Sequence, residues 1–211
     1  MSKLPPTVFI ERASPSYVKL FQAIGFKIVY SVASNPDLVC FTGGEDVTPS
    51  YYGAGKHPRT HNSELRDQIE KRLFQQAVSM GIDMVGICRG GQFLNVMNGG
   101  KMYQDVSRHT QDHVIVDRFT NERIFATSTH HQMMIPGPGS VVVATAMQGG
   151  FKEYVTEEGE IVREKEEENL PDTEIVYYDK TASLCFQPHP EFGTLELQEY
   201  FKNLLSRIFF L

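Results

Sequence analysis

One cysteine of this chain stands where an apolar run meets a glycine-rich stretch. Residues 84–91 (MVGICRGG) contain the spacing G-x-C-x-G, the thiol counterpart of the G-x-S-x-G nucleophile elbow. Flanking glycines allow a tight turn from a strand into a helix, and a helix N-terminus favours a thiolate. The pattern predicts that Cys88 is a nucleophile. The alternative, a cysteine that only packs, suits Cys40 and Cys185 better, because both lie in apolar runs without such glycines.

A thiol nucleophile needs a base that takes its proton and later delivers it to the leaving group. Among the seven histidines, His189 follows an apolar run and stands between Pro188 and Pro190, which stiffen the backbone. Residues two positions apart in an extended chain project to the same side, so Glu191 can fix the tautomer of the imidazole. Alone, this segment also suits a surface turn with an incidental His and Glu. Together with Cys88, it predicts a Cys88, His189, Glu191 triad.

Two other pairs of histidines are four positions apart, a spacing that can bind a metal ion when both lie on one helix face. These pairs are His57 with His61 and His109 with His113. Pro58 argues against a helix for the first pair, and the second pair runs into a strand-like segment. We therefore predict no metal site, and the chemistry of the triad requires no cofactor.

The scaffold that positions these residues is predicted to be α/β. In the first half of the chain, strand-like segments alternate with helix-like ones, which indicates a parallel sheet covered on both faces. The strands are expected at Thr7–Ile10, Phe26–Val32, Leu38–Phe41 and Met84–Ile87. From Asp112 to Val155, short runs rich in Val, Ile and Thr indicate antiparallel strands.

Two helices are expected to pack on this sheet through an apolar face. The first follows Ser63 and stops at Gly81, and its apolar residues at fourfold spacing predict one buried face, made of Leu65, Ile69, Leu73, Phe74, Ala77 and Val78. The last helix begins after Gly193. Its predicted buried face comprises Leu197, Tyr200, Phe201, Leu204, Leu205, Ile208 and Phe209.

Composition limits the classes of partner. A length of 211 residues with 41% hydrophobic content suits one domain over residues 1–211. A formal charge of −6 opposes binding to a phosphate backbone, so we expect no nucleic-acid partner. No apolar stretch approaches about 18 residues, so we expect no membrane partner. The N-terminal residues do not resemble a signal peptide and the three cysteines show no CxxC spacing, which favours the cytoplasm.

Acidic residues are concentrated between Glu157 and Glu168, which hold seven glutamates against Arg163 and Lys165. Such a composition resists burial. It predicts a solvated loop, with a lid or a partner-docking segment as the alternative.

Four segments together resemble the class I glutamine amidotransferase-like superfamily, and most closely its γ-glutamyl hydrolase and γ-glutamyl-γ-aminobutyrate hydrolase branch (peptidase C26-like). They are residues 41–53 (FTGGEDVTPSYYG), the block 86–105 around Cys88, 128–132 (STHHQ) and 187–191 (QPHPE). The resemblance implies a flavodoxin-like, three-layer α/β sandwich around a mostly parallel sheet, with an added antiparallel segment. It also implies the triad described above.

The resemblance further implies an oxyanion hole made by the backbone N–H groups of Gly44 and Arg89. Two adjacent glycines after a strand let bare backbone approach a developing oxyanion, which agrees with this role. Contacts to the glutamyl part of the substrate are implied for Gln92, Ser128, His130 and His131. Because His130 and His131 are adjacent, we expect one to line the substrate cleft and the other to pack.

The activity implied by the resemblance is hydrolysis of a γ-glutamyl amide bond, in glutamine or in a γ-glutamyl amine, through a thioester on Cys88. Its partner is then a small γ-glutamyl substrate. A second hypothesis is a glutaminase subunit that passes ammonia to a separate synthetase or amidoligase. A third is a non-catalytic binding protein on the same fold.

Overall fold

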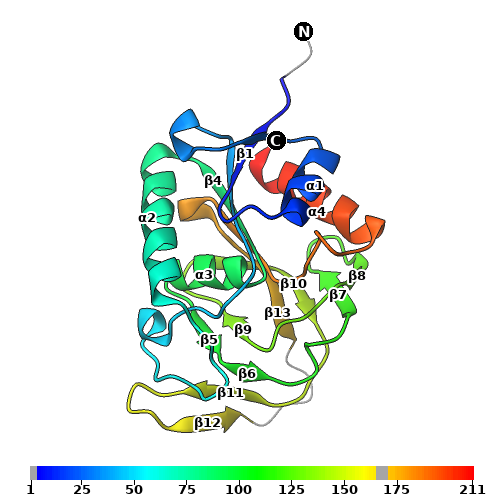
Figure 1. Ribbon diagram of the computed structural model, residues 1–211. Coiled ribbons are helices and arrows are strands. Elements are labelled where there is room, and N and C mark those ends of the chain that lie inside the picture. Colours follow the sequence, from blue (N-terminus) through cyan, green and yellow to red (C-terminus); the bar gives the residue numbers. More distant parts are fainter. Residues whose placement is uncertain (1–3, 165–170) are drawn as a thin grey trace.

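A nine-stranded mixed sheet forms the centre of the computed structural model, which describes residues 4–164 and 171–211 (Figure 1). The strand order is β2-β1-β3-β4-β14-β13-β10-β7-β8. The first five strands pair in parallel and comprise β2 (Lys27–Val29), β1 (Thr7–Ile10), β3 (Leu38–Phe41), β4 (Asp83–Ile87) and β14 (Ser183–Phe186). The remaining strands pair antiparallel and comprise β13 (Asp172–Tyr178), β10 (Ser140–Ala146), β7 (His113–Asp117) and β8 (Arg123–Ala126).

The carboxyl ends of β3, β4 and β14 lie side by side, because these three strands are parallel neighbours. All residues of β3 and β14 are buried, as expected for strands covered on both faces. In open α/β sheets, ligands bind beyond the carboxyl ends of the strands. The segments that follow these three strands hold Gly43-Gly44, Cys88 and His189, so the topology brings the predicted chemistry to one edge.

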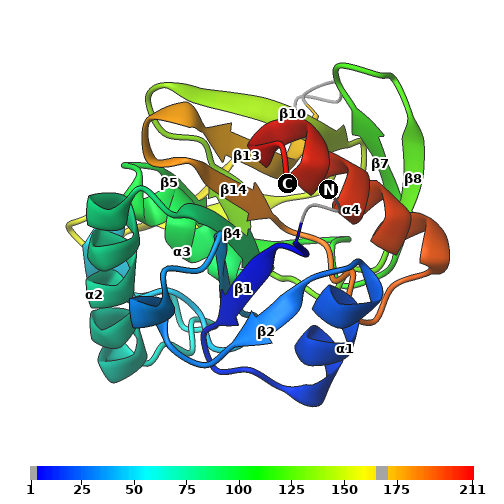
Figure 2. The same cartoon turned by 90° about the horizontal axis from the view of Figure 1, so that it is seen from above.

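Helices cover both faces of the sheet and form a three-layer sandwich (Figure 2). The helices α1 (Pro15–Ala23) and α4 (Leu195–Phe209) pack on one face. The helices α2 (Glu64–Met80) and α3 (Arg89–Met97) pack on the other face. Each face has its own apolar cluster. The predicted fold class is confirmed, and its antiparallel segment extends the parallel sheet by four strands.

Helix α4 matches its prediction closely. It begins with a cap in which the Thr194 hydroxyl accepts a hydrogen bond from the backbone N–H of Leu197. Six of the seven predicted residues are buried, and Ile208 lies half-buried beside them.

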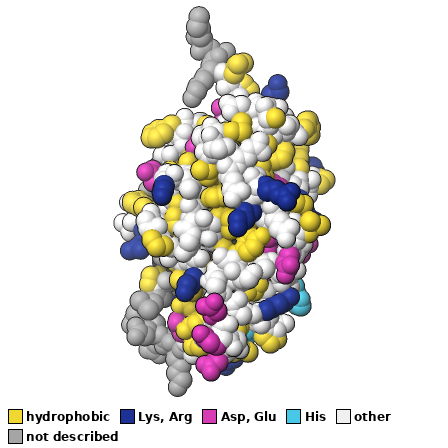
Figure 3. All heavy atoms as spheres, turned by 90° about the vertical axis from the view of Figure 1, so that its left-hand side faces the viewer, with side chains coloured by type: hydrophobic (Ala, Val, Ile, Leu, Met, Phe, Trp, Pro, Cys, Tyr) yellow, Lys and Arg dark blue, Asp and Glu magenta, His cyan; other side chains and the backbone are white. Residues whose placement is uncertain are grey.

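The predicted buried face of α2 is wrong in part. Leu73, Phe74 and Ala77 are buried, but the side chains of Leu65 and Ile69 are 69% and 51% exposed, and Val78 is exposed as well. Figure 3 views this side of the molecule, where hydrophobic side chains lie scattered among charged ones. The first two turns instead bury Arg66, Asp67 and Glu70. Charged residues occupy the inward positions because oppositely charged partners neutralise them there.

Two smaller sheets lie beyond the main one. The first joins β12 (Ile161–Glu164), β11 (Lys152–Val155) and β6 (Asp105–Val106), and the second joins β5 (Lys101–Tyr103) and β9 (Met133–Ile135). The acidic segment is therefore not all loop, because its residues 161–164 pair with β11. Residues 165–168 lie outside the described part of the chain.

The second strand is shorter than predicted, since β2 ends at Val29 and a short 3-10 helix, η1, covers Val32–Ser34. Two further 3-10 helices are η2 (Pro49–Tyr52) and η3 (Asp179–Thr181). Among the described residues, no helix combines the length and apolar character that crossing a bilayer requires.

Candidate active site

Cys88 occupies a strained turn between β4 and α3. Its φ of 52° is a backbone conformation that residues with a side chain rarely adopt. The turn requires glycine at position 86, because a Cβ there would lie only 2.2 Å from the backbone of Gly90. The backbone N–H of Cys88 donates to the carbonyl of Phe186 at 2.8 Å, which ties the turn to β14. This is the geometry of a nucleophile elbow.

His189 is held beside this cysteine by contacts on both ring nitrogens. Its Nδ1 lies 2.8 Å from Oε1 of Glu191, and its Nε2 lies 3.0 Å from the hydroxyl of Thr129. The backbone N–H of His189 donates to the carbonyl of Thr127 at 3.0 Å. Because Nδ1 donates its hydrogen bond to Glu191, Nε2, which also meets the Thr129 hydroxyl, is the nitrogen that can face Cys88. The structure thus brings together the three residues predicted as the triad.

The electrostatics of this group favour an ion pair. Burial opposes protonation of His189, but its contacts with Cys88 and Glu191 outweigh burial and raise its pKa to about 10. The ring is therefore an imidazolium at neutral pH, and it pairs with the Glu191 carboxylate at 2.8 Å. Cys40 and Cys185 are fully buried, and burial raises the pKa of both thiols well above its usual range. Their prediction as core residues is confirmed.

The segment after β3 approaches the same site with its backbone. Gly44 has a φ of +140°, and a Cβ there would lie 2.2 Å from a guanidinium nitrogen of Arg66. The N–H of Arg89 is the first of helix α3 and has no acceptor within the helix. Both predicted oxyanion donors therefore lie at the edge of the sheet that holds Cys88.

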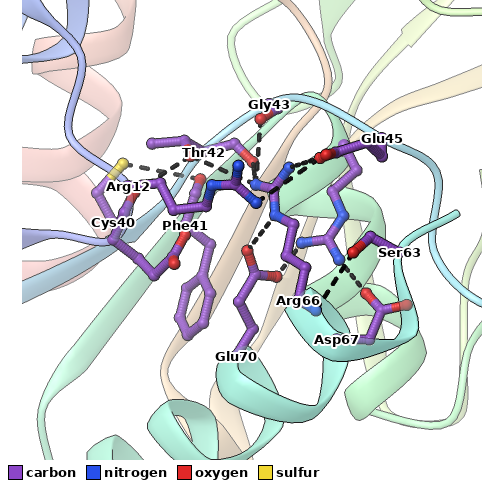
Figure 4. A network of polar contacts seen from close by, with 12 residues as sticks. Arg12, Cys40, Phe41, Thr42, Gly43, Glu45, Ser63, Arg66, Asp67 and Glu70 are labelled. Carbon is purple, nitrogen blue, oxygen red and sulfur yellow. Dashed lines mark hydrogen bonds and ion pairs between the residues drawn. The ribbon is translucent and has the colours of Figure 1, made fainter.

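A buried charge network fixes the Gly43-Gly44 segment (Figure 4). The guanidinium of Arg66 donates to the carbonyls of Thr42 and Gly43 at 2.9 and 3.1 Å. It also pairs with Glu70 at 2.7 Å and Glu45 at 2.8 Å. Through these bonds, helix α2 holds the backbone that follows β3.

The second arginine of this network, Arg89, pairs with both Asp67 and Glu70. Its side chain is 2% exposed, and those of its two partners are fully buried. Two arginines, Arg66 and Arg89, thus balance two fully buried carboxylates, which lowers the large cost of burying charge. Arg66 and Asp67 are therefore parts of a structural ion-pair network.

Two cavities meet at the predicted triad and share Gly44 and His189. One has a volume of about 260 Å³ and contains the thiol; it is also lined by Asp46, Arg89, Gln92, His131 and Gln132. The other has a volume of about 350 Å³ and is lined by Arg12, Tyr17, Glu45, Arg66, Glu191 and Phe192, among others. His189 therefore stands between two spaces, as a general acid between an acyl group and a leaving group would.

The four predicted substrate contacts are placed differently. Gln92 lies in the thiol cavity, and its Nε2 donates to the carbonyl of Gln132 at 3.2 Å. His131 also lines this cavity, with Nε2 3.3 Å from Asp46. His130 also borders this cavity, but it is only 3% exposed and its Nε2 lies 3.6 Å from Glu174 on β13, so the expected division between one lining and one packing histidine holds only in part.

Ser128 is buried behind the lining of this cavity. Its hydroxyl donates to the carbonyl of His109, and its N–H donates to Asp112 at 3.0 Å. These bonds shape the segment that leads to Thr129. A direct contact between Ser128 and the substrate stays a prediction.

Two further residues contact His189 or the neighbouring Gly43, and no signal in the sequence singled them out. Thr129 belongs to the STHHQ segment, but no role was assigned to its hydroxyl. Tyr17 lies in α1, and its hydroxyl accepts a hydrogen bond from the N–H of Gly43 at 2.9 Å. The apolar pattern of α1 gives no indication of this contact, because it depends on how the helix packs beside β3.

Two groups of residues among those described have the donors to hold a metal ion. They are His109, His113, His130 and Glu174, and separately His57, Asp105 and Glu153. All are buried, and within each group the donor atoms lie within 4.8 Å of one another. The expected absence of a metal site stays a prediction. The histidines of the first group come together from loop and strand segments, which a helix-based spacing argument does not address.

Comparison with known proteins agrees with this fold and site. The sequence profile of the Peptidase C26 family matches residues 9–152, which is more than half of the chain. The matched part includes Cys88 and the STHHQ segment, whereas His189 and Glu191 lie beyond it. A glutamine amidotransferase-like protein of Lactococcus lactis subsp. cremoris, the YvdE homolog, is 29% identical over 150 residues, which cover 56% of this chain and 80% of that protein.

Solved structures share the fold at low sequence identity. A protein described as a GMP synthase subunit from Thermoplasma acidophilum superposes with a TM-score of 0.65 at 12% identity, covering 98% of this chain and 96% of its own. A chain of PurLQS from Thermotoga maritima gives a TM-score of 0.61 at 15% identity, covering 96% and 99%. The profile match over residues 9–152 and this shared fold together show that the chain belongs to the Peptidase C26 family, within the class I glutamine amidotransferase-like superfamily.

Proposed function

We propose that this protein hydrolyses a γ-glutamyl amide bond through a thioester on Cys88. The observation that carries the proposal is the arrangement of His189, whose Nδ1 is held by Glu191 and whose ring lines one cavity with the thiol of Cys88 in its elbow turn. Membership of the Peptidase C26 family supports the same class of chemistry.

The residues suit a two-step acyl transfer. The Cys88 thiolate attacks the γ-carbonyl carbon, and the oxyanion that forms accepts hydrogen bonds from the N–H groups of Gly44 and Arg89. The carbon–nitrogen bond then breaks, and the His189 imidazolium gives its proton to the leaving amine. In the second step, neutral His189 takes a proton from water, which attacks the thioester. The carbon–sulfur bond breaks, and glutamate leaves with the thiolate restored.

The cavity on the other side of His189 supports an amine larger than ammonia as the leaving group. A volume of about 350 Å³ exceeds what ammonia needs, since one water occupies about 30 Å³ of liquid. Arg12 and Glu45 line this cavity with opposite charges. Such a pair suits an amine that itself carries a charged or polar group. A γ-glutamyl amine is therefore the substrate class that we favour over glutamine.

A second candidate is a glutaminase subunit that passes ammonia to a separate synthetase. The fold shared with a protein described as a GMP synthase subunit supports this alternative. The two candidates use the same thioester and differ in the fate of the nitrogen.

Covalent labelling tests the thioester. Purified protein is treated with a glutamine-analogue electrophile, and the adduct is located by peptide mass spectrometry. We expect one adduct, on Cys88, which is lost in Cys88→Ala. The matched control is Cys185→Ala, which removes a core thiol and leaves labelling in place. A folded protein that is never labelled at Cys88 would contradict both enzyme candidates and support the non-catalytic hypothesis.

Turnover then separates the two enzyme candidates. We expect steady release of glutamate from a panel of γ-glutamyl amines by the isolated protein. Labelling of Cys88 without turnover of any amine, and release of ammonia from glutamine only after a synthetase is added, would instead favour the glutaminase candidate.

A further inference from the structure

Three histidines and one glutamate form a buried cluster behind the STHHQ segment. His109 precedes β7, His113 begins β7, His130 follows β8, and Glu174 lies on β13. None of the four residues is more than 5% exposed. One ring nitrogen from each histidine faces Oε1 of Glu174, at 3.2 Å for His109 Nδ1, 3.1 Å for His113 Nε2 and 3.6 Å for His130 Nε2.

The opposite nitrogen of each ring already has an acceptor. His109 Nε2 lies 3.1 Å from Asp172, His113 Nδ1 lies 2.9 Å from the carbonyl of Gln111, and His130 Nδ1 lies 2.8 Å from the carbonyl of Gln132. A neutral imidazole that donates from one nitrogen presents a lone pair on the other. In that tautomer of all three rings, the lone pairs converge on the space beside the Glu174 carboxylate, and His113 Nε2 gives up its 3.1 Å hydrogen bond to Oε1.

Two of the three inward nitrogens make no hydrogen bond. His109 Nδ1 and His130 Nε2 have no partner with hydrogen-bond geometry, although both lie close to the carboxylate oxygen. The second oxygen of Glu174, Oε2, has no partner either. Buried polar atoms without partners are costly. Lone pairs directed at an anionic oxygen add repulsion, which a shared cation would remove.

We propose that His109, His113, His130 and Glu174 bind one divalent transition-metal ion, with Zn²⁺ as the ion best suited to three imidazoles and one carboxylate. Zinc takes four ligands in a tetrahedron, with bonds of about 2.0–2.2 Å, so the distance between neighbouring ligand atoms is about 3.3–3.6 Å. The three nitrogen–oxygen distances of 3.1, 3.2 and 3.6 Å bracket this value. Ring nitrogens held from outside by a carboxylate or a carbonyl are typical of metal-binding histidines.

The charges around the cluster agree with a cation. The carboxylate of Asp172, which holds His109, is itself paired with Lys152 at 2.5 Å. Glu174, by contrast, is fully buried and faces only the three histidines among its ion-pair partners in the described part of the chain. The second group of possible ligands differs, because Arg59 pairs with Asp105 and Arg163 pairs with Glu153. Two arginines already neutralise that group, so we propose no ion there.

The site would position catalytic residues without contacting the substrate. His130 directly follows Thr129, whose hydroxyl lies 3.0 Å from His189 Nε2. The backbone N–H of Gln187, two residues before His189, donates to the carbonyl of Glu174 at 2.9 Å. A metal ion that joins His130 to Glu174 would therefore fix two segments that hold the catalytic imidazole. Four protein ligands leave no open position, which is typical of a structural site.

Metal analysis of the untagged full-length protein tests the proposal independently of any activity. After dialysis against Zn²⁺ and removal of free metal, we expect one zinc ion per chain by elemental analysis. Replacement by Co²⁺ should give the visible absorption of tetrahedral cobalt. Zn²⁺ should also raise the Tm of chelator-treated protein, with a dependence on free metal concentration that follows single-site binding.

Ligand variants locate the ion. His113→Gln and Glu174→Gln should each lose the zinc and the cobalt absorption, whereas the exposed His61→Ala should keep both. Far-UV circular dichroism establishes which variants fold, and if neither ligand variant does, the titration of the wild-type protein decides. Zinc below a tenth of an equivalent with no Tm change in the wild type would overturn the proposal, as would unchanged zinc content in both folded variants. Because neither readout uses turnover, failure of the proposed hydrolase function would leave this test intact.

Discussion

The His189 imidazole is fixed on three sides, by the Glu191 carboxylate, by the Thr129 hydroxyl and through its backbone to Thr127. Such support sets both the orientation and the tautomer of the ring, and the raised pKa of His189 follows in part from Glu191. The charge state of one side chain therefore controls the pH range of the proposed reaction.

Glu191→Gln should lower kcat by about 10³–10⁴-fold, because the amide no longer stabilises the imidazolium or its tautomer. The activity of the wild-type protein should fall at high pH with a midpoint near the His189 pKa of about 10, because the imidazolium then loses its proton. This midpoint is the alkaline limit of activity. Removing the carboxylate lowers this pKa, so the limit should move to lower pH. A pH profile of kcat/KM measures the shift.

The exposed Glu196→Gln serves as the control for loss of one nearby carboxylate and should leave the profile unchanged. An alkaline limit that stays in place in Glu191→Gln would show that another group sets it.

Gly44→Ala should reduce kcat by about 10²–10³-fold, the usual effect of losing one oxyanion donor. The added Cβ would meet Arg66 and push the backbone away from its position. Gly25→Ala separates this clash from backbone strain, because Gly25 also has a positive φ of +102° but has open space around its Cβ position. The control should lose about 1–3 kcal/mol of stability and keep its kcat. Equal kcat values in the two variants would show that Gly44 does not donate to the oxyanion.

At the scale of elements, helix α2 acts on the active site through charges. Its inward residues Arg66, Asp67 and Glu70 join the segment after β3 to the start of α3. Both predicted oxyanion donors are thereby attached to one helix. A substitution in this ion-pair network should therefore disturb both the packing of α2 and the position of the two N–H donors.

Glu70→Gln should lower the free energy of unfolding by about 3–5 kcal/mol, because removal of one partner leaves the buried Arg66 and Arg89 short of a counter-charge. Denaturant unfolding followed by circular dichroism measures the loss. Glu64→Gln, on the exposed side of the same helix, should cost no more than about 1 kcal/mol. A Glu70 variant as stable as the Glu64 variant would show that the two arginines need no such partner.

The same helix shows where inference from the sequence ends. Its start, its end and three of its buried apolar residues follow from the sequence, as do α4 and the strands β1 and β3. The inward charges of α2 do not, because Arg89, the arginine that helps to neutralise them, belongs to another helix. Hydrophobic periodicity describes one helix at a time, whereas the burial of an ion pair depends on the element that faces it.

A related limit applies to the site. The turn at Cys88 and the contact of His189 with Glu191 could be predicted because their local sequences contain the elbow glycines and the two-residue spacing. The roles of Gly44 and Gln92 are implied by the family resemblance alone. The His109, His113, His130 and Glu174 cluster depends on the order of the antiparallel strands β13, β10, β7 and β8. Sequence spacing alone provides no means to join His130 to Glu174.

At the scale of the whole molecule, two apolar cores lie on opposite faces of one sheet. They share the strands between them, and β14 contributes to both, through Leu184 and Phe186 to one and through Cys185 to the other. We therefore propose that residues 1–211 form a single domain and unfold as one unit.

Phe201→Ala tests this cooperativity from one side of the sheet. Phe201 is fully buried, and its ring packs edge-on against Phe186 at 4.9 Å between centroids. We expect a loss of about 3–5 kcal/mol, which corresponds to about 6–20 °C in Tm for a chain of this size. Calorimetry should show one transition that moves as a whole, whereas Phe119→Ala, at an exposed position, should leave it in place. Two separated transitions would contradict a single domain.

The pairing of β4 with β14 also determines when the site can form during synthesis of the chain. These strands are hydrogen-bonded neighbours in the sheet, yet nearly half of the chain separates Cys88 from His189. The ribosome therefore releases the nucleophile long before its base, and the carbonyl of Phe186 that holds the elbow turn arrives only with β14. A nascent chain that has emerged only as far as β4 has the thiol without the imidazole, so we expect the proposed reaction to begin only after β14 and His189 have emerged.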